Sequence, residues 1–243
     1  MTAKRKIFLI YFLTGVFSLA LIGLYIFLDK LQRNAQQGAL GGPQVVDVGK
    51  EVKEDILTIS NDIELTNQLG EKVRLSDLED KVWVLAQFFA ACPNCAARNG
   101  DHLVELYQRY SDNPDFHMVC MTVDPDSDDE EKLKAYQNAL GGKPENWWFL
   151  TGPKEQLHRY MEDELKFMAV RERTNEEDIA SQGRYAHDMG VAVFGKGLRM
   201  LEKRDLLAAK VEDETMTLYK QFEIDLDNAI KRALSGQGRE GFE

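Results

Sequence analysis

One short stretch of this sequence limits the fold more than any other. Residues 82–89 (VWVLAQFF) form a nearly continuous apolar run of β-forming residues, which leads directly into residues 90–95 (AACPNC). Such a run is typical of a strand buried on both faces, because a half-exposed strand alternates apolar and polar residues. Leu103, Leu106 and Tyr107 then recur at helical spacing. The stretch therefore predicts a central strand, a CxxC turn and a helix.

Strand and helix patterns alternate along the rest of residues 56–234, which indicates βαβ units and a largely parallel sheet. No internal repeat is present. The patterns predict two hairpins, over residues 63–75 and 191–201, a buried strand over 116–123 and a short apolar run over 147–150. They predict three helices: one opened by a Ser127–Glu130 capping box and stopped at Gly141, one over 154–165 and a last one over 212–234. Residues 168–185 are predicted to be a loop or an irregular insertion.

The amino-terminal end has the pattern of a membrane anchor. Residues 7–28 are 22 residues without a charge, and a helix needs about 20 to cross the hydrocarbon core. Lys4, Arg5 and Lys6 precede them, which favours a cytoplasmic amino terminus. A cleaved signal peptide is the alternative, but its apolar region is usually about 7–15 residues long. The prediction is a single-pass inner-membrane protein, with residues 1–6 in the cytoplasm and the soluble domain on the extracytoplasmic, periplasmic side.

Composition sets the remaining boundaries. Residues 29–55 contain the Gly41-Gly42-Pro43 break and no sustained apolar period, so they are interpreted as a linker that tethers or simply spaces the domain. Residues 56–234 form one domain, and residues 235–243 a flexible tail. The net charge of −11 excludes nucleic-acid binding as the main function, since phosphate neutralisation by Lys and Arg supplies most of that affinity.

The two cysteines of the CxxC turn carry the chemistry. At a helix start, Cys92 and Cys95 lie one turn apart, close enough to share a disulfide or a metal ion. The helix amino terminus favours their thiolates. A structural disulfide is the plain alternative. With a third, imidazole ligand the dithiol would suit copper. Of the four histidines, His187 is the one at a loop-to-strand junction; the others are His102, His117 and His158.

Four stretches between residues 63 and 201 resemble the Sco/SenC family of membrane-anchored copper-binding proteins. They are residues 70–89, residues 122–125 (TVDP), residues 147–152 (WWFLTG) and Tyr185-Ala186-His187, in the family's order and spacing. The resemblance implies an α/β thioredoxin-like fold with a central mixed sheet flanked by helices, behind one transmembrane helix. It also implies Cys92 and Cys95 as thiolate ligands and redox pair, and His187 as the imidazole ligand of copper.

The sequence departs from that family in two places. Pro93 and Asn94 are the two residues between the cysteines, as in thioredoxin, whereas the family usually has three. Ala186 precedes the histidine where the family commonly has Asp, and Asp188 follows it. In addition, no proline follows Pro153, although thioredoxin-fold oxidoreductases carry a cis-proline before the strand that faces the CxxC. This absence favours metal binding over general dithiol exchange.

The resemblance implies a metallochaperone that delivers copper, as Cu(I) or Cu(II), to the CuA centre of cytochrome c oxidase. Its partner would be the copper-bearing oxidase subunit or another copper protein. The enzyme alternative is a thiol–disulfide oxidoreductase acting on cysteines of an oxidase or another extracytoplasmic partner, with Cys92 attacking and Cys95 resolving. A redox or copper sensor is a third hypothesis. Cys120 is predicted to be a small buried hydrophobe.

Overall fold

The computed structural model describes residues 57–91, 100–212 and 216–236. The predicted anchor (7–28), the whole predicted linker (29–55) and the tail from residue 237 lie outside these ranges. Within them, no helix is both long enough and apolar enough to cross a bilayer. The anchor and the domain boundaries therefore stay predictions from the sequence.

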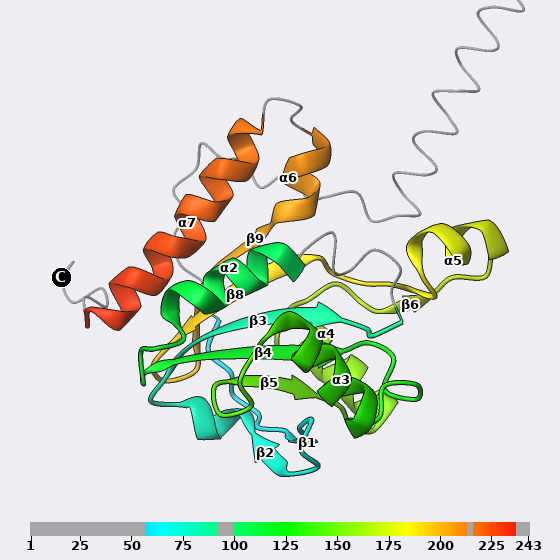
Figure 1. Cartoon of the computed structure of the whole chain (residues 1–243), viewed down its shortest axis with the longest axis horizontal. Helices are drawn as coiled ribbons and strands as arrows, with labels where there is room; N and C mark the ends of the chain where they lie inside the picture. Colours follow the sequence, from blue (N-terminus) through cyan, green and yellow to red (C-terminus); the bar gives the residue numbers. More distant parts are fainter. Residues whose placement is uncertain (1–56, 92–99, 213–215, 237–243) are drawn as a thin grey trace, which may run out of the picture. The chain divides into compact units, whose positions relative to one another are not determined.

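A five-stranded mixed sheet forms the centre of the domain, in the order β5-β4-β3-β8-β9 (Figure 1). The apolar run at residues 82–89 forms the middle strand, as predicted. β4 pairs parallel with it and β5 pairs parallel with β4, whereas β8 pairs antiparallel with β3 and β9 antiparallel with β8, so the sheet is mixed rather than largely parallel. The strands are β3 (Val82–Phe88), β4 (Phe116–Thr122), β5 (Trp147–Leu150), β8 (Gly190–Gly195) and β9 (Arg199–Asp205).

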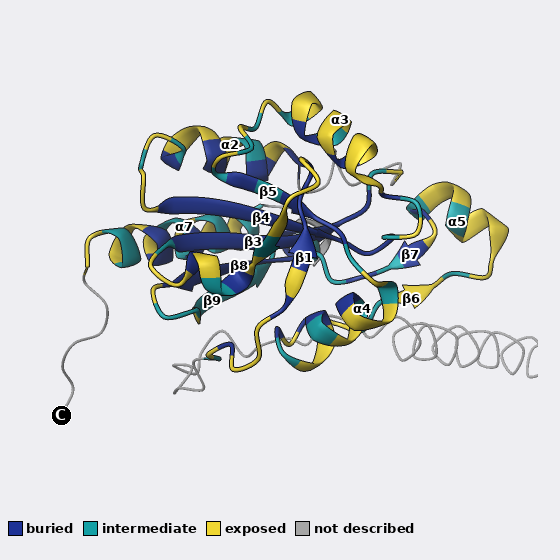
Figure 2. Cartoon of the chain, turned by 90° about the horizontal axis from the view of Figure 1, so that it is seen from below, coloured by how far each residue is buried: buried dark blue, intermediate teal, exposed yellow. Residues whose placement is uncertain are grey.

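Two hydrophobic cores lie on opposite faces of this sheet, because successive side chains of a strand point to opposite faces. Trp83 and Leu85 belong to one core, and Val84 and Ala86 to the other. The first core contains Trp83 stacked on Phe194, with ring centroids 4.0 Å apart. It is closed by α4 (Lys154–Asp163) and by the hairpin of β1 (Glu64–Thr66) and β2 (Lys72–Arg74). The second core is closed by four helices, α2 (Asp101–Tyr110), α3 (Glu130–Leu140), α6 (Leu206–Glu212) and α7 (Thr217–Leu234). Figure 2 shows α4 on the opposite side of the sheet from α2 and α3.

The remaining elements begin and end close to the predicted positions. The helix expected from a Ser127 cap begins two residues later, because the side chain of Asp129 accepts the N–H of Lys132. It ends at Gly141, whose φ of +75° favours glycine. The elements are β1 (Glu64–Thr66), β2 (Lys72–Arg74), the 3₁₀ turn η1 (Leu75–Leu78), α2 (Asp101–Tyr110), α3 (Glu130–Leu140) and α4 (Lys154–Asp163).

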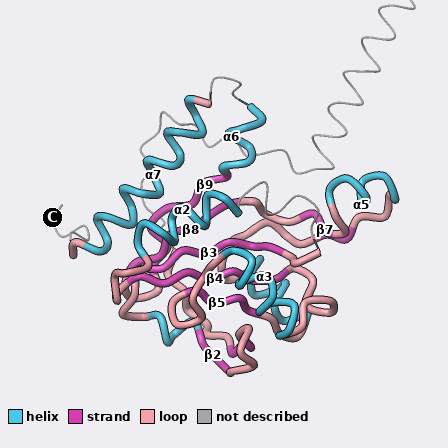
Figure 3. The backbone as a smooth tube through the Cα atoms, viewed as in Figure 1, coloured by secondary structure: helices cyan, strands magenta, loops and turns pink. Residues whose placement is uncertain are grey.

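Two segments differ from the sequence prediction (Figure 3). Residues 168–185, expected to be irregular, contain β6 (Arg171–Glu172) and α5 (Glu176–Gln182) and lead into β7 (Tyr185–Ala186), which pairs with β6. None of the α5 residues is buried, so this segment has no apolar period to indicate a helix. The last helix expected over 212–234 is α7 (Thr217–Leu234), which begins later than predicted, and the short helix α6 (Leu206–Glu212), which was not predicted, precedes it.

Candidate metal and redox site

The predicted thiol pair follows the carboxyl end of the central strand. Cys92 and Cys95 themselves lie outside the described residues, which resume at Gly100. The strand end that leads to them is well defined: Val123 donates its N–H to the carbonyl of Phe88 at 2.8 Å, and Ala90 donates its N–H to the Asp128 carboxylate at 3.1 Å. The chain is therefore held on its β4 side up to two residues before Cys92.

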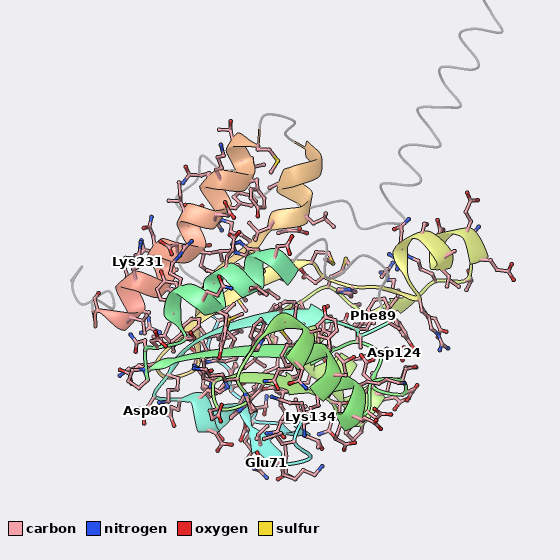
Figure 4. All side chains as sticks on the ribbon, viewed as in Figure 1. Glu71, Asp80, Phe89, Asp124, Lys134 and Lys231 are labelled. Carbon is pink, nitrogen blue, oxygen red and sulfur yellow. The ribbon has the colours of Figure 1, made fainter. Side chains whose placement is uncertain are left out.

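The structure brings His187 to the same strand end. His187 lies between β7 and β8, and its ring meets the ring of Phe89 edge to face, with centroids 5.8 Å apart at 81°. Tyr185 contacts Phe89 in the same way at 6.0 Å. Figure 4 places Phe89 and Asp124 at one end of the sheet. Although Cys92 and His187 are 95 positions apart along the chain, tertiary folding places this histidine beside Phe89, three positions before Cys92.

A hydrogen bond selects the tautomer of His187. Its Nδ1 lies 2.8 Å from the carbonyl oxygen of Asp188, and because a carbonyl can only accept, Nδ1 carries the proton. In the neutral ring the lone pair then resides on Nε2, the atom through which such a tautomer binds a metal. The side chain is buried, with 8% of its surface exposed. The chemistry of this residue therefore fits an imidazole ligand.

Asp188 anchors the segment that carries the histidine. Its carboxylate accepts the N–H groups of Gly190 at 2.7 Å and Met168 at 2.9 Å, and it pairs with Lys203 at 2.5 Å. The Asp188 side chain is only 13% exposed. The Asp that the family places before the histidine is Ala186 here, and the carboxylate that follows the histidine organises the loop instead.

Gln87 links this loop to the central strand. Its side-chain oxygen accepts the backbone N–H of Asp188 at 3.1 Å, and its amide nitrogen lies 3.3 Å from the sulfur of Met161. Gln87 is 4% exposed, and these two contacts explain why a buried apolar strand contains a polar residue. The hydrogen bond to Asp188 fixes the position of the His187 loop relative to the strand that leads to Cys92.

Two buried carboxyl groups, those of Asp124 and Asp128, lie in the segment that follows β4. Besides the Ala90 N–H, Asp128 accepts a hydrogen bond from the Thr122 hydroxyl. Burial raises the pKa of Asp128, against the opposing effect of these two hydrogen bonds. One oxygen of each carboxyl group has no hydrogen-bond partner among the described residues. The sequence leaves open whether Asp124, at a strand end, caps a turn or helps to hold the site loop, and it does not single out Asp128, because an Asp in an acidic stretch is usually a solvated one.

The other three histidines lie away from this strand end or are already engaged. His117 is buried on β4 against Trp148, and burial lowers its pKa to about 3. His158 of α4 has its Nε2 2.8 Å from the carbonyl of Val123. His102 is buried on α2, with its Nδ1 3.2 Å from Glu223. The choice of His187 as the candidate ligand stays a prediction that this geometry supports.

Cys120 is fully buried on β4, and burial raises the pKa of its thiol to about 12. Trp147 donates its indole N–H to the Cys120 sulfur at 3.3 Å, so the site is not purely apolar.

We expect Cys120→Ala to lower the free energy of unfolding by about 1–3 kcal/mol, because it leaves a buried donor without a partner. Cys120→Ser should lower it by less, because the hydroxyl oxygen can accept that N–H. Copper binding should be unchanged in both; chemical denaturation and copper titration check this, and loss of copper from a folded variant would contradict it.

The fold and the strand end define a class: a thioredoxin-like α/β protein in which a buried histidine lies beside the residues that lead into a CxxC sequence. The sequence pattern of the SCO1/SenC family matches residues 53–216. This match covers more than half of the chain, and the chain therefore belongs to the SCO1/SenC family. The resemblance found in residues 63–201 is confirmed.

Individual relatives are distant in sequence. The SCO1 protein homolog of Bacillus subtilis (strain 168) is 25% identical over 124 residues, which are 51% of this chain and 61% of that protein. The match thus spans less than two thirds of that relative. A SCO1/SenC family lipoprotein from Bacillus anthracis str. Ames is 22% identical, with a TM-score of 0.56 over 71% of this chain and 95% of that one.

Two further solved structures share the fold. BsSco, described as a member of the Sco family of cytochrome c oxidase assembly proteins with a disulfide switch, has a TM-score of 0.54 at 22% identity, over 73% of this chain and 96% of that one. Arabidopsis thaliana ScoI, solved with copper bound, has a TM-score of 0.50 at 18% identity, over 67% of this chain and 99% of that one. At these identities the likeness establishes the fold.

Proposed function

We propose that this protein binds copper and delivers it to the CuA centre of a cytochrome c oxidase. Cys92 and Cys95 would hold the ion as thiolates and His187 as a neutral imidazole. The observation that carries the proposal is the position of His187 beside Phe89, with the proton on Nδ1 and the lone pair on Nε2. Thiolates favour Cu(I) and imidazole nitrogen favours Cu(II), so this ligand set suits either oxidation state.

Family membership supports the same assignment. Copper is bound in solved Sco structures, and BsSco is described as an oxidase assembly protein. The partner would be the copper-bearing oxidase subunit, which receives the ion by exchange of ligands. We also propose that residues 7–28 anchor the domain in the inner membrane and that the domain lies on the extracytoplasmic side, where a tether would raise its effective concentration near a membrane partner.

A second candidate function is thiol–disulfide exchange, favoured by the two-residue spacing of Cys92 and Cys95. The Cys92 thiolate would attack a partner disulfide and release one partner thiolate. Cys95 would then attack the mixed disulfide and release the other, so that two electrons pass to the partner and a Cys92–Cys95 disulfide forms. The disulfide switch described for BsSco fits this chemistry. Such a step would keep the oxidase cysteines reduced before copper arrives.

The experiment that separates these functions uses the full chain in detergent with two substrates. We expect the reduced protein to reduce insulin at least about tenfold more slowly than thioredoxin, because His187 and Asp188 precede β8 where an oxidoreductase has a proline to position its substrate. We expect the copper-loaded protein to transfer its ion to a reduced CuA-site peptide. Cys92→Ser/Cys95→Ser is the control and should be inactive in both assays.

Insulin reduction at the thioredoxin rate would contradict the copper-delivery assignment and favour the oxidoreductase. Failure to bind copper in the reduced state would do the same. Reduction of the oxidised CuA-site peptide without reduction of insulin would show that the dithiol serves one partner.

A further inference from the structure

A second cluster of metal-ligating side chains lies between α2 and α7, apart from the loop of His187. It consists of His102 and Glu105 from α2 and Glu223 from α7, whose ligand atoms all lie within 4.8 Å of one another. Positions 102 and 105 are three apart on one helix, so their side chains share a face. Figure 1 shows α7 alongside α2, and the third ligand comes from that neighbouring helix.

We propose that His102, Glu105 and Glu223 form a binding site for a divalent first-row transition-metal ion such as Zn²⁺. One imidazole and two carboxylates are ligands that Zn²⁺ accepts, with a water completing four-coordination. Two ligand atoms at about 2.0–2.1 Å from a tetrahedral ion lie about 3.3–3.4 Å apart. The His102 Nδ1 and the nearer Glu223 oxygen are already 3.2 Å apart.

The charges of the cluster support a cation. Within the described residues, neither Glu105 nor Glu223 forms an ion pair with a Lys or Arg. The neighbouring contact between the same two helices is different: Asp227 of α7 pairs with both Arg109 and Lys231. The charge of Arg109 acts on His102, but Arg109 is paired with Asp227, so a divalent ion would supply the positive charge that these two carboxylates lack as a direct partner.

Burial prepares His102 to be a ligand. The residue is 6% exposed, and its Nδ1 already faces the Glu223 carboxylate at 3.2 Å. Glu105 is exposed and Glu223 half-buried, which leaves a path for the ion and freedom for Glu105 to close on it.

The site would have a structural consequence for α7. The buried residues of this helix, Leu226, Ala229 and Ile230, are in its second half, whereas Glu223 precedes them. An ion at Glu223 would fix the first half of α7 to α2. Glu223 lies beyond residue 216, where the family match ends, whereas His102 and Glu105 lie within it.

The test is Zn²⁺ binding by the full chain in detergent, with Cys92→Ser and Cys95→Ser present so that thiolates do not contribute. We expect one Zn²⁺ per chain by equilibrium dialysis, and at least about tenfold weaker binding in Glu105→Gln and in Glu223→Gln. Glu105→Gln changes an exposed side chain and should fold normally. Asp101→Asn, which removes a charge next to His102 without removing a ligand, is the matched control and should bind as the parent does.

Hydrogen exchange supplies a second readout, since Zn²⁺ should slow exchange of the amides in the first half of α7 and should fail to do so in Glu223→Gln. Unchanged Zn²⁺ affinity in both glutamine variants would overturn the proposal. An equal loss in Asp101→Asn would also overturn it, because the effect would then be one of general charge.

Discussion

Replacing His187 with alanine is expected to lower the affinity of the reduced protein for Cu(II) by more than about 100-fold. Changes in groups around a metal ligand cost about 10–100-fold, and the loss of the ligand itself should exceed that range. The effect on Cu(I) should be smaller, because the two thiolates of Cys92 and Cys95 provide the ligands that Cu(I) prefers. Competition titration with chelators of known affinity, for both oxidation states, measures this difference.

A second histidine supplies the control for this experiment. His158 lies near the same strand end, with its ring centroid 6.3 Å from that of Tyr185, but its Nε2 is held by the carbonyl of Val123. We therefore expect His158→Ala to leave the Cu(II) affinity close to that of the parent protein. Equal affinities of the parent and His187→Ala, with both proteins folded by circular dichroism, would remove His187 from the copper site.

Asp188→Ala is expected to weaken both the fold and the site. Removal of this carboxylate leaves Lys203 and the N–H groups of Gly190 and Met168 without their acceptor. Because these groups are partly buried, we expect the free energy of unfolding to fall by about 2–4 kcal/mol. Copper affinity should fall by about 10–100-fold, since Asp188 positions His187 without touching the ion.

Two comparisons distinguish positioning from general destabilisation. Asp188→Asn keeps an acceptor oxygen and should lose less copper affinity than Asp188→Ala. Glu172→Ala breaks an ion pair with Arg184 whose side chains are 48% and 51% exposed, so it should cost less than about 1 kcal/mol and leave copper binding intact. If Glu172→Ala and Asp188→Ala had equal effects, the anchoring role assigned to Asp188 would be wrong.

Local sequence patterns were sufficient to predict a strand or a helix end where burial or backbone conformation follows directly from residue type. Residues 82–89 indicate a strand buried on both faces, and the structure places β3 at the centre of the sheet. Gly141 ends α3 because its positive φ suits glycine. The exposed α5 was missed, since a helix without a buried face leaves no periodic signal.

The candidate site likewise has residues that the sequence indicates and contacts that it does not. The sequence indicates a reactive CxxC turn, and the position of His187 at a loop-to-strand junction marks it as a ligand candidate. The sequence does not show that the hydrogen bond between Gln87 and Asp188 holds this loop against the central strand. These two residues are 101 positions apart along the chain, so no local pattern indicates their contact.

The sequence by itself determined the α/β class, the central strand that leads into Cys92, and membership of the SCO1/SenC family. Only the tertiary structure decided which polar residues are structural, which carboxyl groups are buried, and that His102 and Glu223, 121 residues apart, lie at 3.2 Å. The physical reason is that hydrophobic periodicity is a local property of the chain, whereas the environment of a polar side chain depends on the distant elements that pack around it.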